Sequence, residues 1–164
     1  MKRVLHAIDS INKYLGTILA FFNIAIVVMV CWEIVARYGF NAPTVWATDG
    51  MVMLTGYIMI LAAGYVQLHK RHVRIDVLYA NLGTKTQAVL DIITFFMFSL
   101  LMYAIIWHGW LFAWEGIKVR ETAGTPWDPI VYPLKTAIPL GASLLWLQMT
   151  ADLIRKVYYA FTGK

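Results

Sequence analysis

The residues best suited to chemistry gather in one short polar segment between long apolar runs. Residues 69–76, with the sequence His-Lys-Arg-His-Val-Arg-Ile-Asp, hold two of the four histidines of this 164-residue chain. A metal centre needs three or four ligands at matched spacing, and neither His69 with His72 nor any pair of acidic residues provides that spacing. We therefore interpret the segment as a charged loop whose basic residues orient the chain, and not as a metal site.

No other group of residues in the sequence forms a catalytic constellation. His108 is the one histidine inside an apolar run, and a buried haem usually takes two axial ligands from facing helices. We expect His108 to be hydrogen-bonded within a helical bundle. The chain also lacks the motifs of serine hydrolases, P-loop proteins and dinucleotide-binding proteins. These observations predict that the chain is not an enzyme and carries no cofactor or metal of its own.

The composition is that of a membrane protein. Hydrophobic residues make up 60% of the chain and charged residues only 14%, whereas soluble domains are about half apolar and about a quarter charged. The net charge of +5 does not indicate nucleic-acid binding, because the basic residues flank the apolar runs and form no continuous basic face. The lone cysteine, Cys31, permits no internal disulfide. The first apolar run is too long for a signal peptide, so we expect an uncleaved first span.

Four apolar runs are long enough to cross a bilayer as helices, because about 20 residues span about 30 Å of hydrocarbon. We predict an all-α integral membrane protein with a single domain over residues 1–164 and four transmembrane helices, none of them broken within the membrane by glycine or proline. Short interfacial helices are expected at residues 1–13 and 77–82. The predicted spans cover about residues 14–37, 47–68, 88–114 and 135–155, the last with Pro139 in its first turn.

The distribution of lysine and arginine predicts how the chain sits in the bilayer. Ten of the 14 lie in the N-terminal segment, the 69–91 loop or the C-terminal tail, and the other four lie in the 33–49 and 115–135 loops. Cytoplasmic segments of membrane proteins carry the excess of these residues. Both termini are therefore expected in the cytoplasm (N-in/C-in), which agrees with an even number of spans, because that places both termini on the same side.

Two local patterns within the spans predict contacts between or along helices. Glu33 and Arg37 are four residues apart with the acid first, an order that favours a salt bridge along one helix face. Either the pair is an ordinary interfacial ion pair, or one of the two residues contacts a partner subunit, because unpaired ionisable groups at membrane depth are costly. Gly56, Ala63 and Gly64 fall on one helical face that is small enough for close helix packing.

Three motifs at the ends of the apolar runs resemble a known family. The first is Arg-Tyr-Gly-Phe-Asn-Ala-Pro at residues 37–43, followed by Trp46. The second is His-Val-Arg-Ile-Asp at residues 72–76, and the third joins Tyr-Pro-Leu-Lys at 132–135 with Ile-Pro-Leu-Gly at 138–141. In this order, over about residues 14–155, they are similar to the small membrane subunit (DctQ-like, Q-type) of tripartite ATP-independent periplasmic (TRAP) transporters. Asp49 stands where that family commonly has Glu.

The resemblance implies a role in transport across a bacterial inner membrane. In such a system a periplasmic binding protein captures an organic acid, and a large multi-span permease subunit carries it across with Na⁺ by an elevator-type movement. The small subunit supports the large one. Its expected partners are therefore the large permease subunit, the periplasmic binding protein and membrane lipids, without nucleic acid. Na⁺ is expected in the large subunit and not in this chain.

The same resemblance implies candidate residues at a subunit interface. We expect Arg74 and His72 to contact Asp76 and to hold a short cytoplasmic helix, while the residues of the 33–49 region shape the outer face near the large subunit. Topology and helix capping alone are the alternative explanation for all of them. The candidates are Glu33, Arg37, Tyr38, Asn41, Trp46, Asp49, His72, Arg74 and Asp76.

Two other functions compete with the transporter subunit. A membrane anchor of a respiratory enzyme is disfavoured by the lack of paired intramembrane histidines, and an autonomous small channel is disfavoured by the uncharged spans. A complete transporter is also disfavoured, because secondary transporters usually build their substrate sites from broken helices. The sequence leaves the substrate open among dicarboxylates, 2-oxo acids, sugar acids and small sulfonates, and it leaves the stoichiometry of the complex open.

Overall fold

The computed structural model describes residues 2–69 and 83–162, and helices account for most of them. Four helical segments are long and apolar enough to cross a membrane: Leu5–Gly39, Val45–Leu68, Val89–Lys118 and Tyr132–Tyr158. The predicted class, an all-α membrane protein with four membrane helices, is confirmed. The elements are α1 (Lys2–Ile34), the π-helix η1 (Val35–Gly39), α2 (Val45–Leu61), α3 (Ala63–Leu68), α5 (Thr84–Lys118) and α6 (Tyr132–Thr162).

The first helix begins earlier than the sequence predicted. Residues 2–13, expected as a separate interfacial lead-in, form the first turns of α1 without a break. Two of its polar residues, Asp9 and Asn12, bind side chains of α6, and Asn12 is only 1% exposed. The segment continues the span because its polar side chains bind another helix of the same chain.

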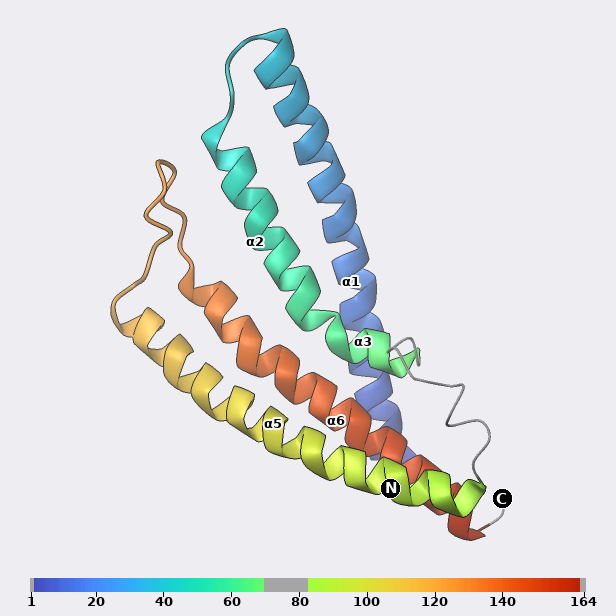
Figure 1. The fold of residues 1–164 in the computed structure, drawn as a ribbon. Coiled ribbons are helices and arrows are strands. Elements are labelled where there is room, and N and C mark those ends of the chain that lie inside the picture. The colour runs from blue at the N-terminus through green and yellow to red at the C-terminus, as the bar shows by residue number, and fades with distance from the viewer. Residues whose placement is uncertain (1, 70–82, 163–164) are drawn as a thin grey trace.

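The second span is interrupted at one residue, which is neither a glycine nor a proline. α2 ends at Leu61 and α3 begins at Ala63, with Ala62 between them. Ala62 keeps helical dihedral angles, and its N–H still donates to the Ile58 carbonyl at 3.0 Å. The span therefore changes direction at Ala62 (Figure 1), without a proline or glycine at that position.

The bend directs the two glycines of the predicted small face toward different helices. A Cβ on Gly56 would lie 3.0 Å from the Leu134 side chain of α6, whereas a Cβ on Gly64 would overlap the Asn12 side chain of α1. Close packing at both glycines is confirmed, and the nearest side chain at each belongs to a different helix.

The last span also begins earlier than predicted. α6 starts at Tyr132, so Pro133 and not Pro139 lies in its first turn. Pro139 is instead inside the helix, where it removes one backbone hydrogen bond. Its ring is buried against α5, since a Cβ on Gly109 would lie 3.4 Å from the Pro139 ring. Packing against a neighbouring helix allows the proline to remain within the span.

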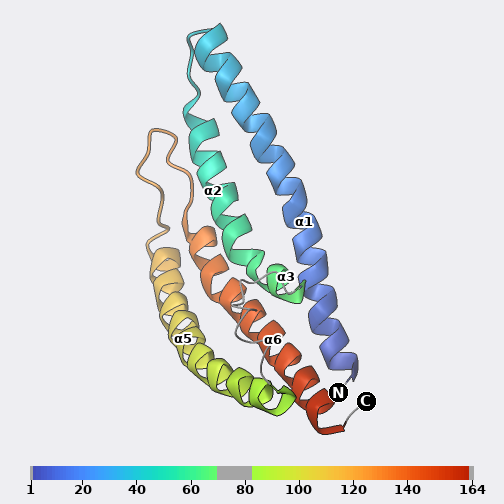
Figure 2. The same ribbon diagram turned by 45° about the vertical axis from the view of Figure 1, so that its right-hand side comes forward.

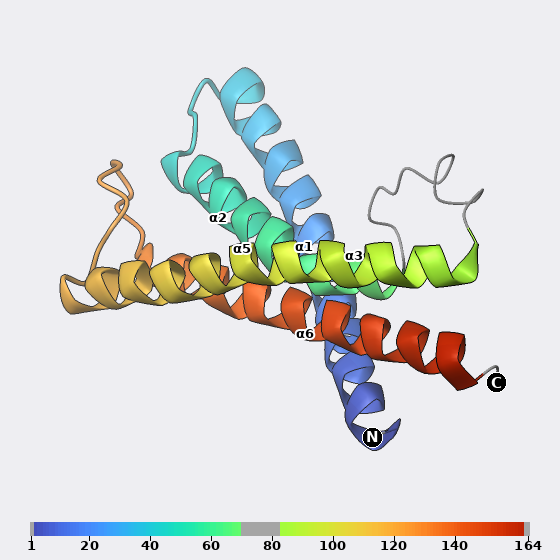
Figure 3. The ribbon, with the colours of Figure 1, turned by 60° about the horizontal axis from the view of Figure 1, so that its bottom comes forward.

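The four spans form two helical hairpins that cross near the chain termini. Residues 40–44 join α1 to α2, and residues 119–131 join α5 to α6 (Figure 1). We call the end that carries these connections the hairpin end, and the end that carries both chain termini the terminal end. α6 packs against α5 along one side and against α1, α2 and α3 on the other, and the two hairpins separate toward the hairpin end (Figure 2). In a view tilted toward the terminal end, α1 crosses α6 steeply (Figure 3).

The interior of the described bundle is made largely of small and polar side chains, while large apolar side chains lie outside. This distribution suits helices that pack in lipid, where small residues allow close approach and the hydrocarbon solvates the large ones. It leaves the bundle with extensive apolar surface on every span. The buried apolar residues are Leu19, Ala36, Ala47, Met102, Ala113, Ala137 and Ala151.

Candidate interface site

Glu33 is the centre of a polar clamp that joins α1 to α2 at the hairpin end. One carboxylate oxygen accepts hydrogen bonds from Arg37, at 2.7 Å from Nη2 and 3.1 Å from Nε. The other accepts from the backbone N–H of Thr44 at 3.0 Å and from the Thr44 hydroxyl. Because Thr44 is the N-cap of α2, the predicted Glu33–Arg37 pair is present and also fixes where the next helix begins.

Arg37 lies in the widened π-helical turn that ends the first span. Its side chain is 52% exposed, whereas the side chain of Glu33 is 10% exposed, so the clamp turns its positive charge outward. Such π-helical turns often occur at functional sites. The chain then reverses at Asn41, whose φ of 51° is a left-handed conformation that asparagine adopts more readily than most residues. Tyr38, in the same turn, is exposed.

Asp49 links the two hairpins at this end. Its Oδ2 accepts a hydrogen bond of 2.6 Å from the hydroxyl of Thr125, in the connection between α5 and α6. The connection has its own local structure, because Glu121 forms a salt bridge with Lys135 and the Asp128 carboxylate accepts a hydrogen bond from the Gly124 N–H. The long connection is therefore held in place beside the start of α2.

The structure places six of the nine candidates at the hairpin end but does not assemble them into one cluster. Glu33 and Arg37 contact each other, Asp49 contacts Thr125, and Tyr38, Asn41 and Trp46 are exposed. His72, Arg74 and Asp76 lie outside the described residues. A role for any of the nine in binding a partner subunit stays a prediction.

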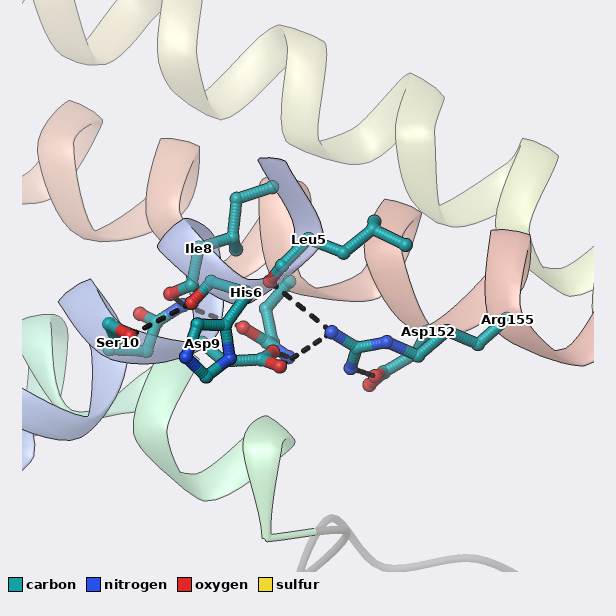
Figure 4. A network of polar contacts seen from close by, with 9 residues as sticks. Leu5, His6, Ile8, Asp9, Ser10, Asp152 and Arg155 are labelled. Carbon is teal, nitrogen blue, oxygen red and sulfur yellow. Dashed lines mark hydrogen bonds and ion pairs between the residues drawn. The ribbon is translucent and has the colours of Figure 1, made fainter. Parts of the chain in front are cut away.

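A second group of polar residues, which sequence reasoning missed, joins α1, α3 and α6 at the terminal end. We call it the terminal network. Its most charged part is an ion pair of 2.5 Å between Arg155 Nη2 and Asp9 Oδ2 (Figure 4). The same arginine also donates to the Leu5 carbonyl at 3.2 Å and lies 3.4 Å from Asp152. The network consists of Asp9, Asn12, Gln67, Gln148, Asp152 and Arg155.

Gln148 connects the charged part of the terminal network to its buried part. Its side-chain amide donates to Asp9 at 3.0 Å and its carbonyl accepts from Asn12 at 2.8 Å, and the residue is completely buried. Gln67 of α3 donates to Asp152 at 3.0 Å. Three helices from distant parts of the sequence are thus tied by hydrogen bonds that cannot be exchanged readily for water.

One atom of the network has no conventional hydrogen-bond partner. The side-chain oxygen of Asn12 is buried and accepts no hydrogen bond within the described chain. It lies against the backbone of Gly64, so closely that a Cβ there would overlap it. A weak Cα–H hydrogen bond from the glycine partly replaces the missing conventional one. Such weak bonds recur where helices approach closely.

The sequence spacing of the terminal-network residues indicates polar faces on two of the helices. Gln148, Asp152 and Arg155 are four and then three residues apart, which places them on one face of a helix, and Asp9 and Asn12 are three apart. Polar faces on two apolar helices predict that each needs a protein neighbour. The pattern does not say which helix that neighbour is, because only the packing brings α1 against α6.

Within the described residues, no group of three or more His, Cys, Asp or Glu side chains is placed to hold a metal ion. His108 does not lie within the bundle as predicted. Its side chain is exposed on α5 and makes no hydrogen bond to the described residues.

The fold and these contacts define a multi-pass helical membrane protein whose buried polar groups bind its own helices. A family model described as "Tripartite ATP-independent periplasmic transporters, DctQ component" matches residues 26–158. The chain belongs to this family, which confirms the resemblance seen in the three motifs.

A curated relative carries the name of the same transporter component, and its match covers less of the chain than the family model does. The chain is 28% identical over 106 residues to the C4-dicarboxylate TRAP transporter small permease protein DctQ of Vibrio cholerae serotype O1. The match covers 62% of this chain but only 44% of that protein, so the chain spans less than half the length of this relative.

Proposed function

We propose that this chain is the small scaffold subunit of a TRAP transporter and that it supports a large permease subunit during Na⁺-coupled uptake of an organic acid. A periplasmic binding protein delivers the acid, and the complex sits in a bacterial inner membrane with the terminal end of this chain in the cytoplasm. Na⁺ and the acid bind the large subunit, and this chain performs no catalysis. Family membership supports the coarse part of the proposal.

The observation that carries the scaffold role is the division between inward polar and outward apolar side chains. The terminal network uses its polar groups to bind α1, α3 and α6 to one another. Substrate sites of secondary transporters usually lie at broken helices that present polar groups to a cavity. Here the bend at Ala62 is followed by Gly64, which packs directly against Asn12. These features favour a supporting subunit over one that holds substrate.

The substrate class is a separate part of the proposal. The name of the Vibrio cholerae relative makes C4-dicarboxylates the first class to test. The other acids left open by the sequence, namely 2-oxo acids, sugar acids and small sulfonates, form the comparison set. Because the substrate is held by the other two subunits, changes in this chain should alter the uptake rate without altering the preference among acids.

Co-purification and transport together test the proposal. The tagged chain is co-expressed with the large permease subunit, extracted in mild detergent and recovered on the tag. We expect the permease to co-purify, and we expect proteoliposomes with both membrane subunits to take up the acid only when binding protein and a Na⁺ gradient are present. Recovery of the chain alone or with a haem-bearing complex, or uptake that does not need this chain, would contradict the proposal.

A further inference from the structure

Helix α5 contacts the rest of the described chain mainly along one narrow seam with α6. The seam is made of residues that repeat every three or four positions, so one side of the helix is covered and the remaining sides are open. The buried seam residues are Met102, Gly109, Ala113 and Gly116. Two exposed stripes flank this seam, and they differ in chemistry.

One flank of α5 is aromatic. Its residues follow the helical repeat, and their exposed fractions run from 47% to 72%. Tyr103 and Trp107 stack on each other with ring centroids 6.4 Å apart, and the Lys118 ammonium lies 5.7 Å from the Trp114 ring. Large aromatic side chains near the end of a span are typical of the lipid interface. We call this the aromatic stripe: Phe96, Leu100, Tyr103, Trp107, Trp110 and Trp114.

The other flank carries ionisable residues. Its members each follow an aromatic-stripe residue by one position, which places them about 100° further around the helix. All six are exposed. They include His108 and Glu115, whose side chains make no bond to a described residue, and the small Ala104. We call this the histidine stripe: Met97, Leu101, Ala104, His108, Leu111 and Glu115.

His108 lies too deep to be satisfied by water if lipid surrounds it. It precedes Trp114, where the predicted span ends, by six positions, which is about 9 Å along a helix that rises about 1.5 Å per residue. His108 therefore lies within the roughly 30 Å hydrocarbon layer, one to two turns deeper than the interface. Ionisable side chains at such depth normally face protein or a water-filled cavity, because an unpaired polar group in hydrocarbon is costly.

We propose that the histidine stripe packs against a transmembrane helix of the large permease subunit, that His108 hydrogen-bonds to a polar side chain of that helix, and that the aromatic stripe faces lipid. The proposal rests on the proposed function, which supplies the partner. Ala104 allows the partner helix to approach closely, as small residues do at membrane helix contacts.

The exposed face of α1 is the main alternative contact surface for the permease. Its polar side chains have less need of a protein neighbour. Its polar residues within the span include Thr17 and Asn23, both exposed, and the Thr17 hydroxyl donates to the Lys13 carbonyl at 3.0 Å. The Asn23 amide already donates to the Leu19 carbonyl of its own helix at 3.2 Å. His108 has no comparable bond, so the need for a protein neighbour is greater at α5.

Adjacent leucines on the two stripes provide a matched test. A photo-reactive p-benzoylphenylalanine is placed at Leu101 on the histidine stripe, at Leu100 on the aromatic stripe, or at Val28 on α1, which are 55%, 69% and 62% exposed. The complex is irradiated in native membranes with the large permease co-expressed. We expect cross-links to the permease from Leu101, at least fivefold above those from Leu100.

The other outcomes each overturn the proposal in a recognisable way. Equal or stronger permease cross-linking from Leu100, cross-linking from Val28 alone, or cross-links from Leu101 to a second copy of this chain would each place the contact elsewhere. In all three cases co-purification of the permease with the wild-type chain would leave the proposed function standing. Loss of co-purification itself would instead remove the proposed function.

A second measurement isolates the hydrogen bond of His108. In the co-purification assay with rising detergent, His108→Leu should retain about threefold to tenfold less permease, the range expected for one hydrogen bond between membrane helices. His108→Gln, which keeps a donor and an acceptor, should recover most of the loss, and Trp107→Leu on the aromatic stripe should behave as wild type. Wild-type retention by His108→Leu would overturn the role of His108.

Discussion

The main polar cluster at the terminal end joins residues far apart in the sequence, whereas the clamp at the hairpin end joins residues close together in it. At the terminal end, Asn12 and Gln148 lie 136 positions apart in sequence, and both are buried. At the hairpin end, Glu33 binds Arg37 and Thr44, which are four and 11 positions away. Long-range contacts therefore set how the hairpins cross, whereas local contacts set how one hairpin turns.

The difference in burial should make the ends unequal in stability. A buried polar group that loses its partner keeps the full cost of its desolvation, while an exposed one exchanges its partner for water. The Asp49–Thr125 bond is a contact between the hairpins at the hairpin end, and both of its residues are partly exposed. We expect the terminal end to act as the stable joint of the molecule and the hairpin end to adapt to partners.

The largest expected effect is at Gln148. Gln148→Leu removes the acceptor for Asn12 and a donor to Asp9 at a fully buried position, so the free energy of unfolding should fall by about 3 kcal/mol. Unfolding of the purified chain in mixed micelles of rising SDS fraction measures this. Asn23→Leu is the control, because Asn23 is exposed and bonds only to its own helix among the described residues. An equal loss in both variants would contradict a special role for the terminal end.

A substitution at the contact between α2 and α6 should have the next largest effect. A Cβ on Gly141 would lie 2.5 Å from the backbone carbonyl oxygen of Ile60, which cannot rotate away. Gly141→Ala should therefore cost about 2 kcal/mol, as overpacking of a close contact does, measured by the same SDS titration. Gly39→Ala is the control, because the nearest atom to its Cβ would be 3.8 Å away. A neutral Gly141→Ala would mean that the two helices separate without cost.

A smaller effect is expected for the clamp at the hairpin end. Glu33→Ala should lower the free energy of unfolding by about 1 kcal/mol, because Arg37 is half exposed and can turn to water. Hydrogen exchange should locate the change at the start of α2, where Thr44 loses its acceptor. Faster exchange that reached α6 would show that the clamp stabilises the whole bundle, and the contrast between the ends would then fail.

The smallest effect is expected between the connections. Thr125→Ala removes the hydrogen bond to Asp49, and the carboxylate then binds water, so the loss should be about 0.5 kcal/mol. Thr125→Ser, which keeps the hydroxyl, is the matched control. A cysteine pair that reports the distance between the two connections should show greater separation in Thr125→Ala alone. No change in that distance would mean that this bond does not couple the hairpins.

Much of the fold was predictable because it depends on local quantities. The number of spans follows from the length of each apolar run, and the Glu33–Arg37 pair follows from helical spacing. The family followed from three short motifs in order. The expected site residues lie in the 33–49 and 72–76 regions, near those motifs, and do not include the polar residues of the terminal network.

The sequence by itself determined that this chain crosses a membrane as four helices, because the apolar runs are set by adjacent residues and the backbone must satisfy its own hydrogen bonds in lipid. Only the tertiary structure decided that Asp9 meets Arg155, that the second span bends at Ala62 and that His108 faces outward. Each of these depends on which helices become neighbours. Packing between distant segments decides which helices become neighbours, and the residue spacing within a single helix does not predict it.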